Sequence, residues 1–330
     1  MNTTVLQGAR RSLVTFAALF LATDGVAGEY SYEAGLSYGS SNTDTTAPLL
    51  IVGGNPGTQF GSATSSSDSD LVKLSGSWYY SGLSDKSGPK SRAAFLDRAS
   101  SVYLAYSYDD LSGSYKTSGL QPPLPPGFLP TPPSTGSTDG TTHTLEAGLR
   151  HVWEASGWYG LAGVTRSDTE IDTVFDGSAA SFDLDATAYT LGIGKYFGQA
   201  TALDLSVISS DLDGHDTTAY SLSFNHVGSL GDSWYYAADL GLAVSDEDED
   251  DGTYSLGLAL FPTTKIEFGI QIVHHESAFV DDWDSYGGFV RWFVRDHVEV
   301  NARYREDDWE PNSVVEIDRD QFAIGVNIRF

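Results

Sequence analysis

The sequence contains no cysteine, so its fold must be closed by backbone pairing or by a packed core and not by disulfides. It also lacks any stretch approaching the roughly 18 consecutive apolar residues that a transmembrane helix requires. Basic residues are scarce, because 18 Lys and Arg stand against 45 Asp and Glu, for a formal net charge of −27. Such an acidic chain is poorly suited to nucleic acid. If the protein lies in a membrane, it must cross with strands.

The first 28 residues have the order of a secretory signal peptide. Arg10 and Arg11 precede the apolar run 13–22, and the small residues 25–28 follow it. The apolar run is too short to span a bilayer. We therefore expect residues 1–28 to be cleaved, in preference to forming a buried N-terminal helix, which leaves 16 basic and 44 acidic residues in the mature chain.

From residue 29 onward, the dominant pattern is a segment of about ten residues in which every second side chain is apolar. The chain is also rich in residues that favour strands, with 18 Tyr, 16 Phe and 7 Trp. This pattern predicts an all-β fold, a single antiparallel transmembrane β-barrel formed by residues 29–330. The fourteen expected strands are 29–40, 70–83, 99–112, 142–154, 157–168, 182–197, 201–210, 216–227, 233–245, 252–262, 264–275, 284–294, 297–306 and 318–330.

Short and long connections alternate between these segments. The expected short turns are at 155–156, 198–200, 228–232, 262–264 and 295–296, and the expected long loops are 41–69, 113–141, 169–181, 246–251 and 307–317. This arrangement is typical of outer-membrane barrels, in which long loops are extracellular and both termini are periplasmic. The connection 84–98 is an exception, because it is long on the periplasmic side and has room for a short helix. Twelve or sixteen strands remain alternatives, since 157–168 alternates poorly and 41–69 is long enough for a strand pair.

The alternation also predicts which side chains face outward. In the last strand, Phe322 and Ile324 belong to an apolar row, whereas Asn327 belongs to a polar row. In a membrane barrel the apolar row faces lipid and the polar row faces the lumen. A soluble β-sandwich would use the apolar row as its core, but aromatics such as Trp78 and Trp234 gather near strand ends, as they do at a membrane interface. We therefore favour the membrane barrel.

Phe330 is the last residue and completes the apolar row of the last strand. Outer-membrane barrels commonly end in an aromatic residue that the barrel-assembly machinery reads. We therefore expect Phe330 to be an assembly signal, and the expected location is the bacterial outer membrane.

The stretch Gly88-Pro89 and the later run 93–102, which leads into a Tyr-rich strand, resemble the general porin family of Gram-negative outer membranes. The likeness of layout covers most of the mature chain, whereas the sequence likeness is confined to this stretch and the last strand. Residues 90–92 depart from the acidic and apolar spacer of that pattern. The resemblance implies a passive channel for small hydrophilic solutes, with no catalytic residues and no cofactor.

The polar rows place charged residues on the predicted lumen wall. The pore-lining candidates are Lys73, Glu146, Arg150, Asp204, Asp239, Glu267, Arg291, Arg303, Arg305 and Arg329, together with Glu33 and Glu299. Arginines dominate the last three strands and acidic residues the seventh, ninth and eleventh, so a basic wall would face an acidic one. Such a transverse field would orient small charged solutes. The simpler interpretation is that these residues pair with one another and keep the lumen hydrated.

Two loops invite functional hypotheses. The Pro-rich loop 113–141 is our candidate for an inward-folded constriction, although its stretch 121–126 is also compatible with a stiff loop or a polyproline ligand. The acidic run 246–251 lacks the spaced ligands and turning glycine of an EF-hand. It is best interpreted as solvated charge, with loose divalent-ion bridging to lipopolysaccharide as the alternative.

Three functions are compatible with this architecture. A channel in outer-membrane lipid is the first, and a non-conducting barrel that adheres through its loops is the second. An enzyme is the third, but His226, His274 and His275 lack the accompanying Ser elbow motif of a lipase. We expect neither catalysis nor a metal site.

Overall fold

The computed structural model describes residues 29–49, 61–84, 88–119, 132–231, 233–246, 252–276, 282–309 and 316–330. The predicted signal peptide and the Pro-rich stretch 121–126 lie outside these ranges. Among the described residues, no helix is long and apolar enough to cross a membrane.

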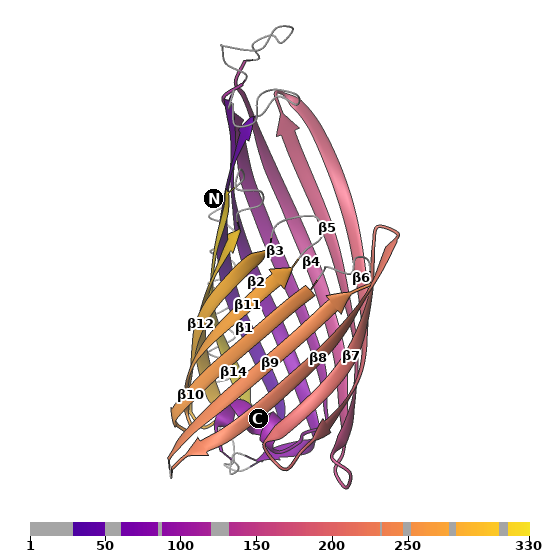
Figure 1. Cartoon of the computed structure of the whole chain (residues 1–330), viewed down its shortest axis with the longest axis vertical. Helices are drawn as coiled ribbons and strands as arrows, with labels where there is room; N and C mark the ends of the chain where they lie inside the picture. Colours follow the sequence, from indigo (N-terminus) through magenta and orange to yellow (C-terminus); the bar gives the residue numbers. More distant parts are fainter. Residues whose placement is uncertain are drawn as a thin grey trace.

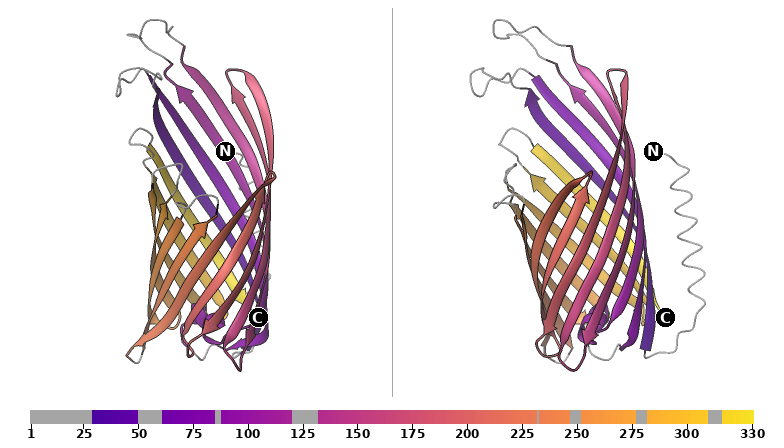
Figure 2. Two further views of the ribbon diagram at one scale, coloured as in Figure 1. Left: turned by 45° about the vertical axis from the view of Figure 1, so that its right-hand side comes forward. Right: turned by 90° about the vertical axis from the view of Figure 1, so that its right-hand side faces the viewer.

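The described residues form a closed barrel of fourteen antiparallel strands, which confirms the predicted fold (Figure 1, Figure 2). Each strand pairs with its neighbours in the chain, and β1 pairs with β14 to close the sheet. The strands are β1 (Glu29–Leu49), β2 (Gly61–Ser84), β3 (Ser101–Thr117), β4 (Ser134–Trp153), β5 (Trp158–Phe175), β6 (Ser178–Tyr196), β7 (Thr201–Leu212), β8 (His215–Leu230), β9 (Trp234–Ser245), β10 (Gly252–Thr263), β11 (Ile266–Glu276), β12 (Trp283–Arg295), β13 (Val298–Trp309) and β14 (Glu316–Arg329). A 3-10 turn, η1 (Lys90–Arg92), leads into the short helix α2 (Ala93–Leu96) between β2 and β3.

Large apolar side chains cover the outer face of the barrel. Phe322 and Ile324 of β14 are 48 % and 44 % exposed, and Leu258 of β10 is 44 % exposed. A β-sandwich would bury this row, so its exposure agrees with a barrel that faces an apolar medium. Ile328 differs, since it is buried in the wall beside its cross-strand partners Ala34 and Val298.

The end of the barrel at which β1 starts and β14 finishes is called here the terminal end, and the opposite end is called the far end. At the far end, strands β1 to β6 continue well past their predicted ends. The 24 residues of β2 span roughly 80 Å at about 3.3 Å per residue, more than a membrane requires. The predicted loops 41–69, 113–141 and 169–181 were therefore wrong over much of their length. Ser, Thr and Asp occupy both faces of these extensions, so no apolar alternation marks them, although the ladder continues without a break in register.

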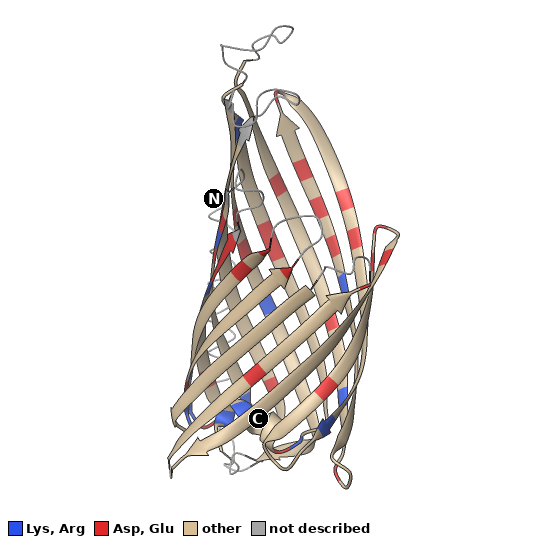
Figure 3. Cartoon of the chain, in the orientation of Figure 1, with Lys and Arg blue, Asp and Glu red and all other residues tan. Residues whose placement is uncertain are grey.

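Several acidic residues of the expected loops 41–69, 113–141 and 169–181 are strand residues in the structure. They are Asp44, Asp68, Asp139, Glu170 and Asp172. Figure 3 shows acidic residues on the upper parts of the long strands and basic residues gathered near the terminal end. Of the predicted acidic loop 246–251, only its first residue is described.

The turns at the terminal end are short, as predicted, and join β4 to β5, β6 to β7, β8 to β9, β10 to β11 and β12 to β13. At the far end, Asp176-Gly177 closes the β5–β6 hairpin and Asp213-Gly214 closes the β7–β8 hairpin. The φ angles are 47° for Asp176 and 81° for Gly177, and they are 53° for Asp213 and 84° for Gly214. These are the positive values that a two-residue type I′ turn requires.

Candidate functional site: the lumen and its inserted segment

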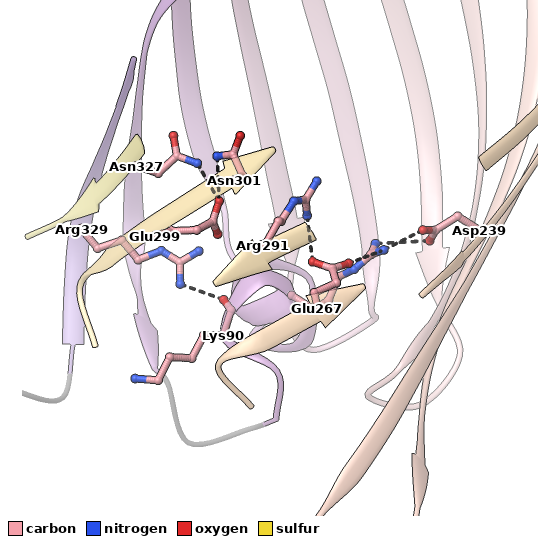
Figure 4. A network of polar contacts seen from close by, with 9 residues as sticks. Lys90, Asp239, Glu267, Arg291, Glu299, Asn301, Asn327 and Arg329 are labelled. Atoms are coloured by element: carbon pink, nitrogen blue, oxygen red, sulfur yellow. Dashed lines mark hydrogen bonds and ion pairs between the residues drawn. The ribbon is translucent and has the colours of Figure 1, made fainter. Parts of the chain in front are cut away.

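The segment 88–100, called here the inserted segment, leaves the wall between β2 and β3 and lies inside the barrel at the terminal end (Figure 1, Figure 4). The backbone N–H of Lys90 donates to the carbonyl of Thr264 at 2.8 Å. At the other end, the Ser100 hydroxyl accepts from the N–H of Val152 at 2.9 Å. The predicted short helix is therefore present, and these bonds attach it to opposite parts of the wall.

Phe95 and Leu96 anchor the inserted segment through apolar contacts. Both pack against a buried cluster on β8, β9 and β10 that includes Phe261, whose side chain is almost fully buried. The Phe95 ring also lies 5.4 Å from the ring of Tyr196, centroid to centroid. Phe95 and Leu96 are half-buried, so each contributes less than the ~1.5–3 kcal/mol that full burial of such a side chain provides. The apolar sequence of α2 thus serves packing against the inner wall.

Arg92 joins the inserted segment to β9 and β11. Its guanidinium donates to both carboxylate oxygens of Asp239, at 2.8 and 3.3 Å, and lies 3.5 Å from Glu267 Oε1. The other oxygen of Glu267 accepts from Arg291 Nη1 at 3.2 Å. Glu267 is only 1 % exposed, so its negative charge depends on these two arginines.

Arg329 holds the opposite side of the inserted segment. Its Nε donates to Glu33 Oε2 at 2.7 Å. Its Nη1 donates to the carbonyl oxygen of Lys90 at 2.7 Å (Figure 4). The guanidinium also lies 5.7 Å from the ring centroid of Tyr30 and 4.8 Å from that of Phe293. A buried cation is stabilised when it has a counter-ion, a carbonyl and aromatic faces together.

Asp296 lies in the β12–β13 turn, outside the strands, between two lysines. Its Oδ1 accepts from Lys265 Nζ at 2.8 Å and from Lys90 Nζ at 3.0 Å. The hydrogen bonds and positive charges of these lysines lower the pKa of Asp296 to about 2. The ion pair between Asp296 and Lys90 thereby connects the inserted segment to the terminal rim. The Asp296 carboxylate in this pair is negatively charged at every pH above the acid range.

Glu299 lies deep in the wall beside Arg329 and is 5 % exposed. Its Oε1 accepts from Asn327 Nδ2 at 2.9 Å and from Asn301 Nδ2 at 3.3 Å. Two neutral amides thus partner this carboxylate, as Figure 4 shows.

Further from the rim, Lys73 of β2 reaches across β3 to Glu146 of β4, with 2.7 Å between Nζ and Oε1. The Tyr103 hydroxyl donates to the other oxygen of Glu146 at 3.2 Å. These three groups form a local cluster on one part of the wall.

Arg150 and Asp204 meet tyrosines. Arg150 Nη2 donates to the Tyr196 hydroxyl, which in turn donates to the carbonyl of Phe95 at 3.0 Å. The Tyr159 hydroxyl donates to Asp204 Oδ2 at 2.9 Å, and the Arg150 guanidinium lies 4.5 Å from the Tyr159 ring centroid. These contacts support the inserted segment from the β4–β7 side.

Arg303 and Arg305 lie further toward the far end on β13. Arg303 Nη2 donates to Gln271 Oε1 at 3.3 Å. Arg305 donates through Nε to Asp307 at 2.6 Å and through Nη2 to the Ser285 hydroxyl at 2.8 Å. They remain apart from the inserted segment and border the open part of the lumen.

The ten predicted pore-lining residues therefore fall into three groups. Arg150, Asp204, Asp239, Glu267, Arg291 and Arg329 hold or support the inserted segment, Lys73 and Glu146 form a local wall contact, and Arg303 and Arg305 are the β13 arginines. The sequence did not reveal Lys90, Arg92 and Phe95 as parts of the lumen, although residues 90–92 had stood out as departing from the family pattern. That departure was the available signal for an inserted segment, because a basic residue inside a barrel can form ion pairs with acidic residues on the wall. Asp239 and Glu267 are engaged by Arg92 and Arg291, whereas an acidic wall would leave them open to the lumen.

The histidines considered for catalysis are dispersed over β8 and β11. His274 Nδ1 lies 2.9 Å from Asp284 Oδ1, and the His275 ring stacks on Trp283 with 4.4 Å between centroids. His226 Nδ1 lies 2.8 Å from the Thr201 hydroxyl. These contacts hold the rings against their neighbouring strands.

Comparison with known proteins found no matching family model and no matching curated protein. Several solved structures of outer-membrane barrels are similar to this chain. The outer membrane protein Omp33 of Acinetobacter baumannii covers 92 % of this chain and 99 % of its own, with 16 % identity and a TM-score of 0.48. The translocator domain of autotransporter NalP from Neisseria meningitidis covers 99 % and 96 %, with 12 % identity and a TM-score of 0.39. OprB of Pseudomonas putida covers 89 % and 92 %, with 9 % identity and a TM-score of 0.37.

Likenesses of this size carry no argument about function. The general porin family that the sequence resembles is not matched by any family model. The functional conclusion must therefore come from the barrel and the lumen themselves.

Proposed function

We propose that the protein is an outer-membrane channel for the passive diffusion of small hydrophilic solutes. The observation that carries this proposal is the division of side chains between the two faces of a closed barrel. The outer face carries a belt of exposed Leu, Ile, Val and aromatic side chains, whereas the inner face carries ion pairs and hydroxyl groups. A closed barrel satisfies its backbone in lipid, and fourteen strands enclose more space than side chains fill from eight.

The proposed setting follows from the same division. The belt contacts outer-membrane lipid, and the polar strand extensions of β1 to β6 reach into the outer aqueous layer, where their acidic residues meet lipopolysaccharide through divalent ions. In this proposal residues 1–28 direct export and Phe330 is read by the barrel-assembly machinery. The Phe330 ring lies against Tyr32 at 5.9 Å between centroids, and its backbone N–H donates to the Tyr32 carbonyl at 3.0 Å.

In the proposed channel, the inserted segment narrows the terminal mouth. It reaches β4, β6, β9, β11 and β14 through the contacts described above, so it lies across the lumen and not along one wall. Loop 113–141 is the other candidate for this role. Its residues 113–117 and 134–141 are strand, and its residues 120–131 lie outside the described ranges. Solutes would pass beside α2.

Liposome swelling tests this proposal. Liposomes that contain the full chain, purified from the membranes of producing cells, should swell in isotonic arabinose and glycine, and more slowly in larger sugars. Proteoliposomes that swell no faster than empty liposomes in any of these solutes would contradict it.

A non-conducting barrel is the second candidate, and the inserted segment is the observation that favours it. A plug that is held by ion pairs on several strands could close the mouth completely. The same swelling assay separates the two, because a sealed barrel admits neither arabinose nor glycine.

A further inference from the structure

A recess opens on the lumen side of the wall that β1, β2, β3, β13 and β14 form. Its volume is about 220 Å³. The polar side chains that line it include Ser41, Ser69, Arg303, Arg305, Arg319 and Gln321. The recess lies toward the far end from the inserted segment, in the part of the lumen that this segment leaves open.

Small residues in register create the recess. Gly39 of β1 is paired with Ala323 of β14, and Ala323 is paired with Arg303 of β13. A Cβ atom on Gly39 would lie 3.3 Å from the backbone oxygen of Phe322 and 3.5 Å from the Ala323 Cβ. A longer side chain in this row would therefore fill the space, and the long side chain of Arg303 borders it from one side.

The next two rows of the ladder carry the other polar groups. Ser41 is paired with Gln321, which is paired with Arg305. One row further, Arg319 of β14 is paired with Asp307 of β13. The arginines thus occupy three successive inward positions of two neighbouring strands.

Two of these guanidinium groups have only neutral hydrogen-bond partners among the described residues. Arg303 donates to Gln271, and Arg319 donates through Nε and Nη2 to the Gln321 amide oxygen at 2.8 and 3.0 Å when that amide is oriented toward it. Arg305, in contrast, is paired with Asp307. The side of the recess formed by β13 and β14 therefore has an excess of positive charge.

The opposite side of the recess carries a negatively charged residue. Asp109 of β3 lines it, and its Oδ1 accepts from the Ser69 hydroxyl at 2.6 Å. An anion in the recess is therefore drawn toward β13 and β14, and neutral hydroxyl groups of a ligand suit the side near Asp109 and Ser69.

We propose that this recess binds small dicarboxylates that carry a hydroxyl group, which enter it from the lumen. The inference deepens the proposed function, on which it rests for the solute's route. A guanidinium donates two parallel N–H groups to a carboxylate. Arg303 and Arg319, the two guanidinium groups with only neutral partners among the described residues, line the same recess from neighbouring strands. Each can therefore donate to one carboxylate of a ligand that carries two carboxylates.

Isothermal titration of L-malate into the full chain in detergent tests this inference. The unmodified chain should bind malate, and the Arg303→Gln/Arg319→Gln variant should lose at least tenfold in affinity. The matched control is Arg166→Gln, which removes an arginine that is 60 % exposed on the outer face of β5 and is paired with Asp168. The control should bind malate as the unmodified chain does.

A second variant guards against misfolding of the double mutant. Ala323→Leu fills the recess and leaves every charge in place, so it should also weaken malate binding at least tenfold. Absence of malate binding to the unmodified chain, or unchanged affinity in both variants, would overturn the inference. Titration reports binding whether or not solutes permeate. Malate binding without liposome swelling would therefore refute the channel alone, and swelling without malate binding would refute the recess alone.

Discussion

Replacing Arg92 with glutamine removes the guanidinium that joins the inserted segment to β9 and β11. Three contacts are lost, to Asp239 at 2.8 and 3.3 Å and to Glu267 at 3.5 Å. Hydrogen bonds between charged groups contribute about 1.5–3 kcal/mol each. Asp239 is about one-third exposed, which reduces its share through solvent screening. We expect a net loss of roughly 2–3 kcal/mol in the free energy that holds the segment in place.

Since about 1.4 kcal/mol corresponds to a factor of ten, the undocked population of the segment should rise roughly 30- to 140-fold. Phe95 and Leu96 should still keep the docked state predominant. Hydrogen exchange of the full chain in detergent measures this directly, because the Lys90 amide is bonded to Thr264 only while the segment is docked. Its exchange should accelerate in Arg92→Gln by that factor.

Two controls make the result specific. Arg166→Gln removes an exposed arginine from the outer face and should leave exchange at Lys90 unchanged. Amides in the β7–β8 ladder should exchange at the same rate in all three proteins, since their pairing does not involve the segment. Unchanged exchange at Lys90 in Arg92→Gln would refute the role of Arg92 as an anchor.

Three further outcomes follow from the lumen contacts. Gly194→Ala should destabilise the barrel by about 1–3 kcal/mol in urea unfolding, because the new Cβ would lie 2.2 Å from Tyr159 Cζ, and unaltered stability would contradict this packing. Neutralising Arg303 and Arg305 together should raise the cation-to-anion permeability ratio in planar bilayers, and an unchanged ratio would exclude them as selectivity elements. The pKa of Asp296 is lowered from 3.8 to about 2, so its stabilising effect is present above pH 3.8 and is lost as pH falls toward 2. Melting curves of Asp296→Asn should show a weaker loss of stability across this interval, and equal curves would exclude the lysine contacts as a source of acid sensitivity.

The sequence predicted the strands well where one face meets an apolar medium. Segment 252–262 coincides with β10 almost residue for residue, because Leu256 and Leu258 alternate with small residues. Prediction was poor where both faces meet water. Residues 61–69 contain Ser, Thr and Asp at successive positions, and nothing in such a run distinguishes a strand from a loop.

The lumen was less predictable than the fold. Strand parity predicts the rows to which Arg291 and Glu267 belong, because a period of two needs no tertiary information, and the two residues are cross-strand partners in the ladder. Their partners depend on where the inserted segment lies, and a short helix in a turn can fold into the barrel or away from it. The role of Arg92 was therefore not predictable from the sequence. The position of the segment inside the barrel explains its charge and its place beside Phe95.

The most direct test of the proposed channel is single-channel recording of the full chain in planar bilayers. We predict discrete current steps whose size increases with KCl concentration, because ions would cross a water-filled path beside α2. Incorporation of the protein, verified by immunodetection in the same membranes, without current steps at any applied voltage would contradict the channel and favour a barrel that the inserted segment seals.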